Sequence, residues 1–120
     1  MFRFTLHRHK AKRAGKHDDL RLEKNKYVES FAIPKGLPLK KGVKRLAIMT
    51  ERHPKSVLNF KGSIPKGEYG AGTLFISKKG TYDTIRRKGK VYIVELNDGK
   101  KQSRYSLVRT RPKQYIIQKI

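Results

Sequence analysis

Short runs in which apolar and polar residues alternate recur along the chain, and this pattern constrains its fold most. In the first run, Phe2, Phe4 and Leu6 alternate with polar residues. A period of two places successive side chains on opposite faces of a β-strand, whereas a helix needs a period near 3.6. Further strand-like runs are residues 20–22, 27–33, 45–50, 73–77, 91–96, 105–109 and 114–120. The sequence therefore predicts an all-β protein with little helix.

Glycine and proline clusters separate these runs and predict the turns between strands. The turn signals are residues 34–36, 41–42, 65–67, 79–80 and 97–99. Asp98-Gly99 lies between two alternating runs, which is a strong hairpin signal. Many short strands joined by such turns are typical of a sandwich or a barrel, and a barrel also leaves no exposed strand edge. We therefore expect one domain, residues 1–120, folded as a compact closed or nearly closed β-barrel.

The charge of the chain limits the partners that it can have. Lys and Arg number 31 against 9 Asp and Glu, which gives a net charge of +22. This excess repels itself in the folded state, and a bound polyanion relieves the repulsion. Membrane surfaces are usually bound by a basic amphipathic helix, and the chain shows no such pattern. Nucleic acid is therefore the favoured partner, although charge does not distinguish binding from catalysis.

The composition also limits the kind of metal site and the compartment. The chain has no cysteine, which excludes disulfides and thiolate ligands and leaves His, Asp and Glu as metal ligands. No apolar run approaches the roughly 20 residues that span a bilayer. The basic N-terminus lacks the apolar stretch of a secretory signal. We expect a mature cytoplasmic protein, monomeric and without membrane association.

Residues 17–23 contain the side chains that are best suited to bind a metal or a phosphate. On a strand, His17, Asp19 and Arg21 share one face, and the two leucines of this segment point to the core. Imidazole and carboxylate together suit Mn, Zn or Fe, and a guanidinium beside them can hold a phosphate. The alternative is a solvated outer strand face with a chance ion pair. Spacing alone leaves both interpretations open.

Three further histidines bear on this choice. His7 and His9 share a face if the first strand continues, and His53 follows later in the chain. A metal site with an open position needs about three protein ligands, which His9, His17 and Asp19 can supply. For His7, a surface position or a hydrogen-bonded buried position is the simpler interpretation.

Motifs spread over nearly the whole chain resemble a known family in their order and spacing. They are Phe4-x4-His9, His17-x-Asp19-x-Arg21-Leu22-Glu23, residues 30–36, residues 44–47, Glu51-x-His53-Pro54, residues 60–72, residues 107–109 and residues 115–119. The chain resembles the 3′-phosphoesterase domain of bacterial DNA ligase D and its stand-alone relatives.

The resemblance implies a β-barrel with a surface pocket that holds Mn²⁺, with Co²⁺ or Zn²⁺ as alternatives. The implied activity removes a 3′-phosphate, and a 3′-terminal ribonucleoside, from DNA primer-template ends. The product is a 3′-OH that a DNA ligase can join during non-homologous end joining.

The resemblance also implies three groups of site residues. The metal ligands are His9, His17 and Asp19. The catalytic residues that hold the reacting phosphate are Arg21 and His53. The basic residues near the phosphate and DNA are Arg13, Lys35 and Arg45. One departure stands out, because the family usually has Tyr four residues after the His-Pro histidine and this chain has Val57.

A non-catalytic basic β-domain that binds nucleic acid is the main alternative. It explains the charge equally well, but it gives no reason for His-x-Asp-x-Arg beside further histidines and a His-Pro step. An endonuclease or an RNA-end phosphoesterase would use the same metal ligands on another substrate.

Overall fold

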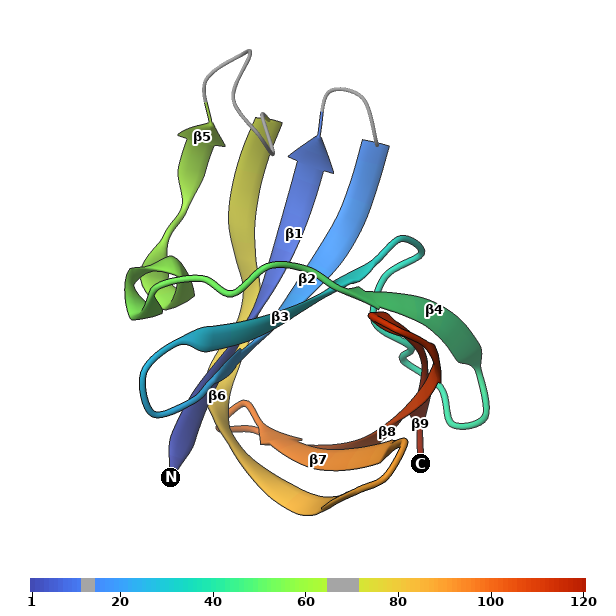
Figure 1. The fold of residues 1–120 in the computed structure, drawn as a ribbon. Helices are drawn as coiled ribbons and strands as arrows, with labels where there is room; N and C mark the ends of the chain where they lie inside the picture. Colours follow the sequence, from blue (N-terminus) through green and yellow to red (C-terminus); the bar gives the residue numbers. More distant parts are fainter. Residues whose placement is uncertain (12–14, 65–71) are drawn as a thin grey trace.

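The computed structural model describes residues 1–11, 15–64 and 72–120, and it confirms the prediction of an all-β chain (Figure 1). The one helical element of these residues is a short 3-10 helix, η1 (Lys55–Asn59). The strands are β1 (Phe2–Ala11), β2 (Gly15–Glu23), β3 (Val28–Ile33), β4 (Lys44–Met49), β5 (Gly62–Ile64), β6 (Gly72–Lys88), β7 (Val91–Asn97), β8 (Gln102–Arg111) and β9 (Gln114–Lys119).

Eight of these strands close into an antiparallel barrel, as predicted. Their order is β1-β2-β3-β4-β9-β8-β7-β6, and β6 pairs with β1 to complete the ring. The closing strand β6 is unusually long because, along the edge opposite β1, it pairs with two strands in succession. Its first part pairs with β5, and its last part, from Thr81 onward, pairs with β7. The short strand β5 therefore lies outside the ring.

The turn predicted at residues 79–80 is wrong, because both residues lie inside β6. Gly80 is needed there for another reason. A Cβ atom at this position would collide with the backbone carbonyl oxygen of Asn97 on β7. The glycine thus permits a close approach of two strands rather than a reversal of the chain.

The hairpin predicted around Asp98-Gly99 is confirmed between β7 and β8. Gly99 has a φ of 90°, a backbone conformation that favours glycine. The Asp98 carboxylate accepts hydrogen bonds from the backbone N–H groups of Lys100 and Lys101 at 2.9 and 3.0 Å. The turn predicted at residues 65–67 lies outside the described residues.

The interior of the barrel holds the hydrophobic core. Leu20 and Leu22 of β2 are fully buried, as their alternation with polar residues predicted. Phe31 of β3 and Tyr115 of β9 meet edge to face inside the barrel, with ring centroids 5.2 Å apart. The polar residues that alternate with the leucines, Asp19, Arg21 and Glu23, consequently lie on the outer surface of the barrel wall.

That outer surface is covered by a segment that we call the strap, residues 53–62, which contains η1. Figure 1 shows the connection from β4 crossing in front of β2 and β1 before it reaches η1. Backbone hydrogen bonds join His53 to Val28 of β3 at 2.8 and 3.1 Å. Further along, the Thr5 hydroxyl donates to the Leu58 carbonyl at 2.8 Å. The strap therefore buries polar side chains against the outside of the barrel.

An ion pair near the chain start gives the fold a defined acid sensitivity. The guanidinium and the backbone N–H group of Arg3 both donate hydrogen bonds to the Glu23 carboxylate, at 2.8 to 3.2 Å. The hydrogen bonds from Arg3 lower the pKa of Glu23 to about 2. A lowered carboxyl pKa stabilises the fold above the ordinary value near 4.5, and this stability is lost as pH falls toward 2.

We therefore expect Glu23→Gln to lower the free energy of unfolding at pH 7. The loss should be only about 1 kcal/mol, because Arg3 is half exposed and water screens the ion pair. The difference from wild type should shrink as pH falls from about 4.5 to about 2. Denaturant unfolding across this pH range measures it, with the exposed Glu51→Gln as the matched control. Parallel pH profiles for wild type and Glu23→Gln would contradict the assignment.

Candidate metal and phosphate site

His9, His17 and Asp19 meet on the outer face of the barrel wall. Antiparallel pairing of β1 with β2 places His9 directly opposite His17, and Asp19 follows two residues later on the same face. His17 Nε2 lies 3.4 Å from Asp19 Oδ1, and His9 Nδ1 lies 3.5 Å from Asp19 Oδ2. The three ligand atoms lie within 4.8 Å of one another. The structure thus gathers the three residues that the sequence grouped as metal ligands.

The chemistry of this donor set fits a divalent transition metal. Two imidazoles and one carboxylate are the ligand types that Mn, Zn and Fe accept. Burial alone would raise the pKa of Asp19, but hydrogen bonding to His17 and the charge of Arg21 hold that pKa below its usual value. Hydrogen bonding to Asp19 raises the pKa of His17 against the opposing effect of burial. The carboxylate is thus ionised, and a metal would compete with the His17 proton.

Arg21 is the next residue along the same face of β2. Its guanidinium is almost completely buried and lies 3.6 Å from the Asp19 carboxylate. A buried cation beside a ligand cluster can bind an anion with little competition from water. The structure therefore places Arg21 where it could hold a phosphate next to the three candidate ligands.

His7 connects Arg21 to the strap. The Arg21 Nε–H group points to His7 Nδ1 at 3.3 Å, and His7 Nε2 lies 2.7 Å from the Phe60 carbonyl oxygen. These partners assign the proton to Nε2, so that the ring donates to Phe60 and accepts from Arg21. Burial lowers the pKa of His7, and the charge of Arg21 acts in the same direction.

His7 is fully buried and hydrogen-bonded, which confirms the second of its two predicted settings. The contact of His7 with Arg21 was not predicted from the sequence. The available signal was the shared face of His7 and His9 on β1.

His53 enters the site from the strap. Its Nδ1 lies 3.2 Å from the Ser30 hydroxyl oxygen, and Ser30 is the register partner of Arg21 on β3. Burial and then the charge of Arg21 lower the pKa of His53. A neutral imidazole therefore stands beside the arginine. Ser30 was part of the motif at residues 30–36 but was assigned no role, because its contact depends on how the strap runs beside β3.

Arg45 and Lys35, two of the predicted phosphate- and DNA-binding residues, contact each other. Arg45 donates to the backbone carbonyls of Lys35 and Gly36 at 2.8 and 3.0 Å. The loop that it braces is also held by Asp18, whose carboxylate accepts from the Leu37 N–H at 2.8 Å. Asp18 precedes Asp19 and so faces the opposite side of β2.

The placement of Lys35 and Arg45 near the phosphate and DNA stays a prediction. Val57 lies in η1 and is half-buried. Arg13 lies outside the described residues.

The fold and the site together define the class of this protein. It is an antiparallel β-barrel whose outer wall carries a His-His-Asp cluster, a buried arginine and a further histidine supplied by a covering segment. Residues 7–109 match the family model described as the DNA ligase D 3′-phosphoesterase domain. The chain belongs to this family, whose description indicates a 3′-phosphoesterase role in DNA repair.

Similar proteins carry names from non-homologous end joining. The multifunctional non-homologous end joining DNA repair protein LigD of Mycobacterium tuberculosis is 41% identical over 98% of this chain. The corresponding LigD proteins of Mycolicibacterium smegmatis and Pseudomonas aeruginosa are each 39% identical, over 98% and 92% of the chain. The chain spans only 14–17% of the length of these relatives. Among the described residues, no helix has the length and apolar character needed to cross a membrane.

Proposed function

We propose that this chain is a metal-dependent phosphoesterase that repairs the 3′ ends of DNA. It would remove a 3′-phosphate, and also a 3′-terminal ribonucleoside, to leave a 3′-OH for a DNA ligase during end joining. One observation carries the proposal: the ligand atoms of His9, His17 and Asp19 lie within 4.8 Å of one another, and the Arg21 guanidinium lies 3.6 Å from Asp19.

His9, His17 and Asp19 would hold the metal, for which Mn²⁺ is our first candidate and Co²⁺ or Zn²⁺ are alternatives. A metal bound there would offset charge on a phosphate oxygen and lower the pKa of a bound water. Protein side chains would supply the rest of the chemistry.

Arg21 would bind the non-bridging oxygens of the terminal phosphate through its fork of N–H donors. Burial beneath the strap makes this interaction stronger than it would be in water. His53, whose Nδ1 contacts Ser30, can present its Nε2–H to the same phosphate. Both groups would stabilise the charge that develops on phosphorus-bound oxygens in the transition state. The basic surface would hold the DNA strand with little preference for sequence, since phosphate contacts do not read bases.

We expect His7 to position Arg21, and a pair of substitutions tests this. His7→Leu removes the acceptor for Arg21 Nε, so we expect kcat to fall about 10- to 100-fold through misplacement of the guanidinium. His7→Gln can still accept from Arg21 and donate to Phe60, so it should recover much of the rate.

Thr5→Val is the matched control for this pair. Thr5 is the register partner of Arg21, and valine keeps its shape while removing the hydrogen bond from β1 to the strap. The kcat of Thr5→Val should remain near wild type even if the free energy of unfolding falls. Equal losses of kcat in Thr5→Val and His7→Leu would show that His7 only anchors the strap.

The test of the proposed function is end processing on defined substrates. Labelled primer-templates ending in a 3′-phosphate or a 3′-ribonucleotide are incubated with the protein and Mn²⁺, Co²⁺ or Zn²⁺, with EDTA as the metal-free control. We expect metal-dependent conversion to a 3′-OH end. RNA primers of the same sequence would reveal a preference for RNA ends. DNA binding without turnover in all three metals would overturn the proposal in favour of a non-catalytic binding domain.

A further inference from the structure

Ser30 is a buried polar residue to which the proposed reaction gives no role. It lies on β3, is fully buried, and is the register partner of Arg21 on β2. Its side chain faces the outer wall of the barrel, because it alternates with Phe31 of the core. Among the described residues, the hydroxyl group of Ser30 has one hydrogen-bond partner, the His53 ring nitrogen Nδ1 at 3.2 Å.

The burial of Ser30 fixes the direction of this hydrogen bond. A serine hydroxyl carries one proton to donate, and a buried donor without an acceptor costs free energy. If Nδ1 carried the ring proton, it would donate to the Ser30 oxygen, and the hydroxyl proton would have no acceptor within the described part of the chain. If Nδ1 is unprotonated, it accepts from Ser30 and both groups are satisfied. The second arrangement places the ring proton of neutral His53 on Nε2.

The surroundings of His53 keep its ring neutral, as this arrangement requires. Burial lowers the pKa of His53, and the charge of Arg21 lowers it further. The carboxylates of Glu51 and Asp19 and the backbone carbonyl of Glu51 raise the pKa, each with a smaller effect. Ser30 acts in the same direction as burial, because a doubly protonated ring has no lone pair to accept its hydroxyl proton.

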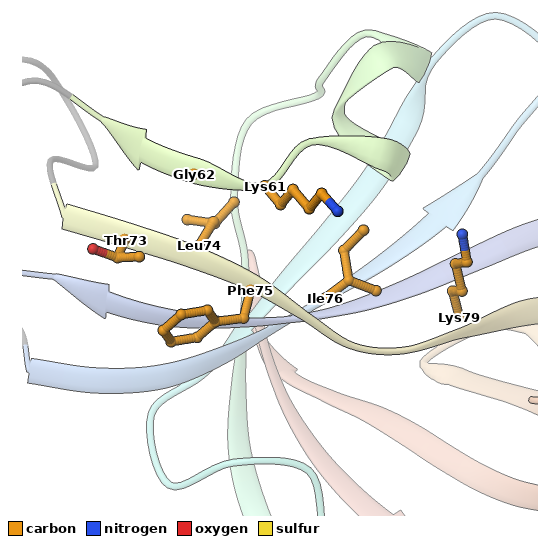
Figure 2. A pocket seen from close by; sticks show the side chains of 7 residues that line it. All are labelled: Lys61, Gly62, Thr73, Leu74, Phe75, Ile76 and Lys79. Carbon is orange, nitrogen blue, oxygen red and sulfur yellow. The ribbon is translucent and has the colours of Figure 1, made fainter.

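The backbone of the strap holds the His53 ring next to Ser30. Two backbone hydrogen bonds fix the start of the strap to Val28 of β3, two residues before Ser30. By contrast, a hollow of about 560 Å³ lies at the other end of the strap, between Lys61 and β6 residues such as Ile76 (Figure 2). His53 therefore belongs to the end of the strap that is fixed against β3, where one hydroxyl can decide the state of the ring.

We propose that Ser30 is a positioning residue that fixes the ring proton of His53 on Nε2. His53 is then a constant hydrogen-bond donor to the terminal phosphate beside Arg21, and neither a base nor the acid that protonates the leaving oxygen. With its one proton on Nε2, the neutral ring can stabilise charge on a phosphate oxygen but has no lone pair there to accept a proton. The contact with phosphate rests on the proposed function, whereas the state of the ring does not.

Long-range proton–nitrogen NMR spectra of the metal-free protein without DNA report which nitrogen of each histidine ring is protonated. The chain has four histidines, and the signals of His53 are those that are absent from His53→Ala. At neutral pH we expect the Nε2–H tautomer in the wild type and a mixture of both tautomers in Ser30→Ala. Ser30→Thr retains the hydroxyl and should retain the Nε2–H tautomer.

Thr50→Val is the matched control. The Thr50 hydroxyl donates to the backbone carbonyl of Ser30 at 3.5 Å, so the substitution removes a hydroxyl beside Ser30 but leaves the bond to the His53 ring in place. We expect it to leave both the tautomer and kcat unchanged.

A double-mutant cycle on a 3′-phosphate end separates positioning from a loss of packing. Ser30→Ala alone should lower kcat about 10- to 100-fold, the range for partners that orient metal-ligating histidines. In the His53→Ala background the same substitution should have little further effect, because Ser30 acts through the ring.

A wild-type His53 ring protonated on Nδ1, or an unchanged tautomer in Ser30→Ala, would overturn the inference. Equal losses of kcat from Ser30→Ala with and without the His53 ring would also overturn it, since Ser30 would then serve packing alone. A wild-type protein that shows the Nε2–H tautomer but releases no phosphate would contradict the proposed function, and the assignment of the ring proton would stand.

Discussion

Asp19→Ala should abolish 3′-phosphate release while leaving the barrel folded. Asp19 is the one carboxylate of the cluster, and its two oxygens lie 3.4 and 3.5 Å from the imidazole nitrogens of His17 and His9. Its loss would remove a direct ligand, whereas loss of an outer-shell partner already costs roughly 10- to 100-fold in metal affinity or activity. We therefore expect a larger loss, to the level of the metal-free protein.

Metal affinity and turnover should fall together in Asp19→Ala. Isothermal titration with Mn²⁺ measures the first, and phosphate release from a 3′-phosphate end at saturating Mn²⁺ measures the second. The matched control is Asp83→Ala, which changes the net charge equally at an exposed position of β6. A folded Asp19→Ala variant with near-normal turnover would exclude Asp19 as a ligand.

Arg21→Lys should lower kcat by about 10²- to 10³-fold, the usual cost of losing one donor that stabilises transition-state charge. Lysine retains the charge but cannot reproduce the planar fork that binds two phosphate oxygens. It also cannot donate to His7 in the geometry of the Arg21 Nε–H group, which lies 3.3 Å from His7 Nδ1. The substitution therefore separates a phosphate clamp from a simple ion pair with Asp19.

Arg87→Lys is the matched control. Arg87 forms a two-pronged ion pair with Glu29, at 3.0 and 3.1 Å, so the same substitution breaks a similar geometry. We expect it to affect the free energy of unfolding and to leave kcat unchanged. Single-turnover rates at saturating substrate compare the two variants. A wild-type rate in Arg21→Lys would show that Arg21 serves only as a counter-ion.

The alternation of residues was sufficient to predict most of the strands and the face on which each side chain lies. Leu20 and Leu22 face the core, and His17, Asp19 and Arg21 face outward, because the period of a strand is a local property. The Asp98-Gly99 hairpin was predictable for the same reason, since its turn chemistry is contained in a few adjacent residues. The turn predicted at Gly80 was wrong, because glycine is required there by the close approach of a distant strand and not by a local turn.

The sequence by itself determined the β class, the strand faces and the residue types available for a metal site. Only the tertiary structure decided which strands became neighbours, and hence that His9 lies opposite His17. It also decided that the strap covers the outer face and brings His53 to Ser30 and Phe60 to His7. The physical reason is that alternation specifies the face of a side chain within its own strand. Contacts between segments about 20 to 50 residues apart depend on strand pairing and chain path, which no local pattern encodes.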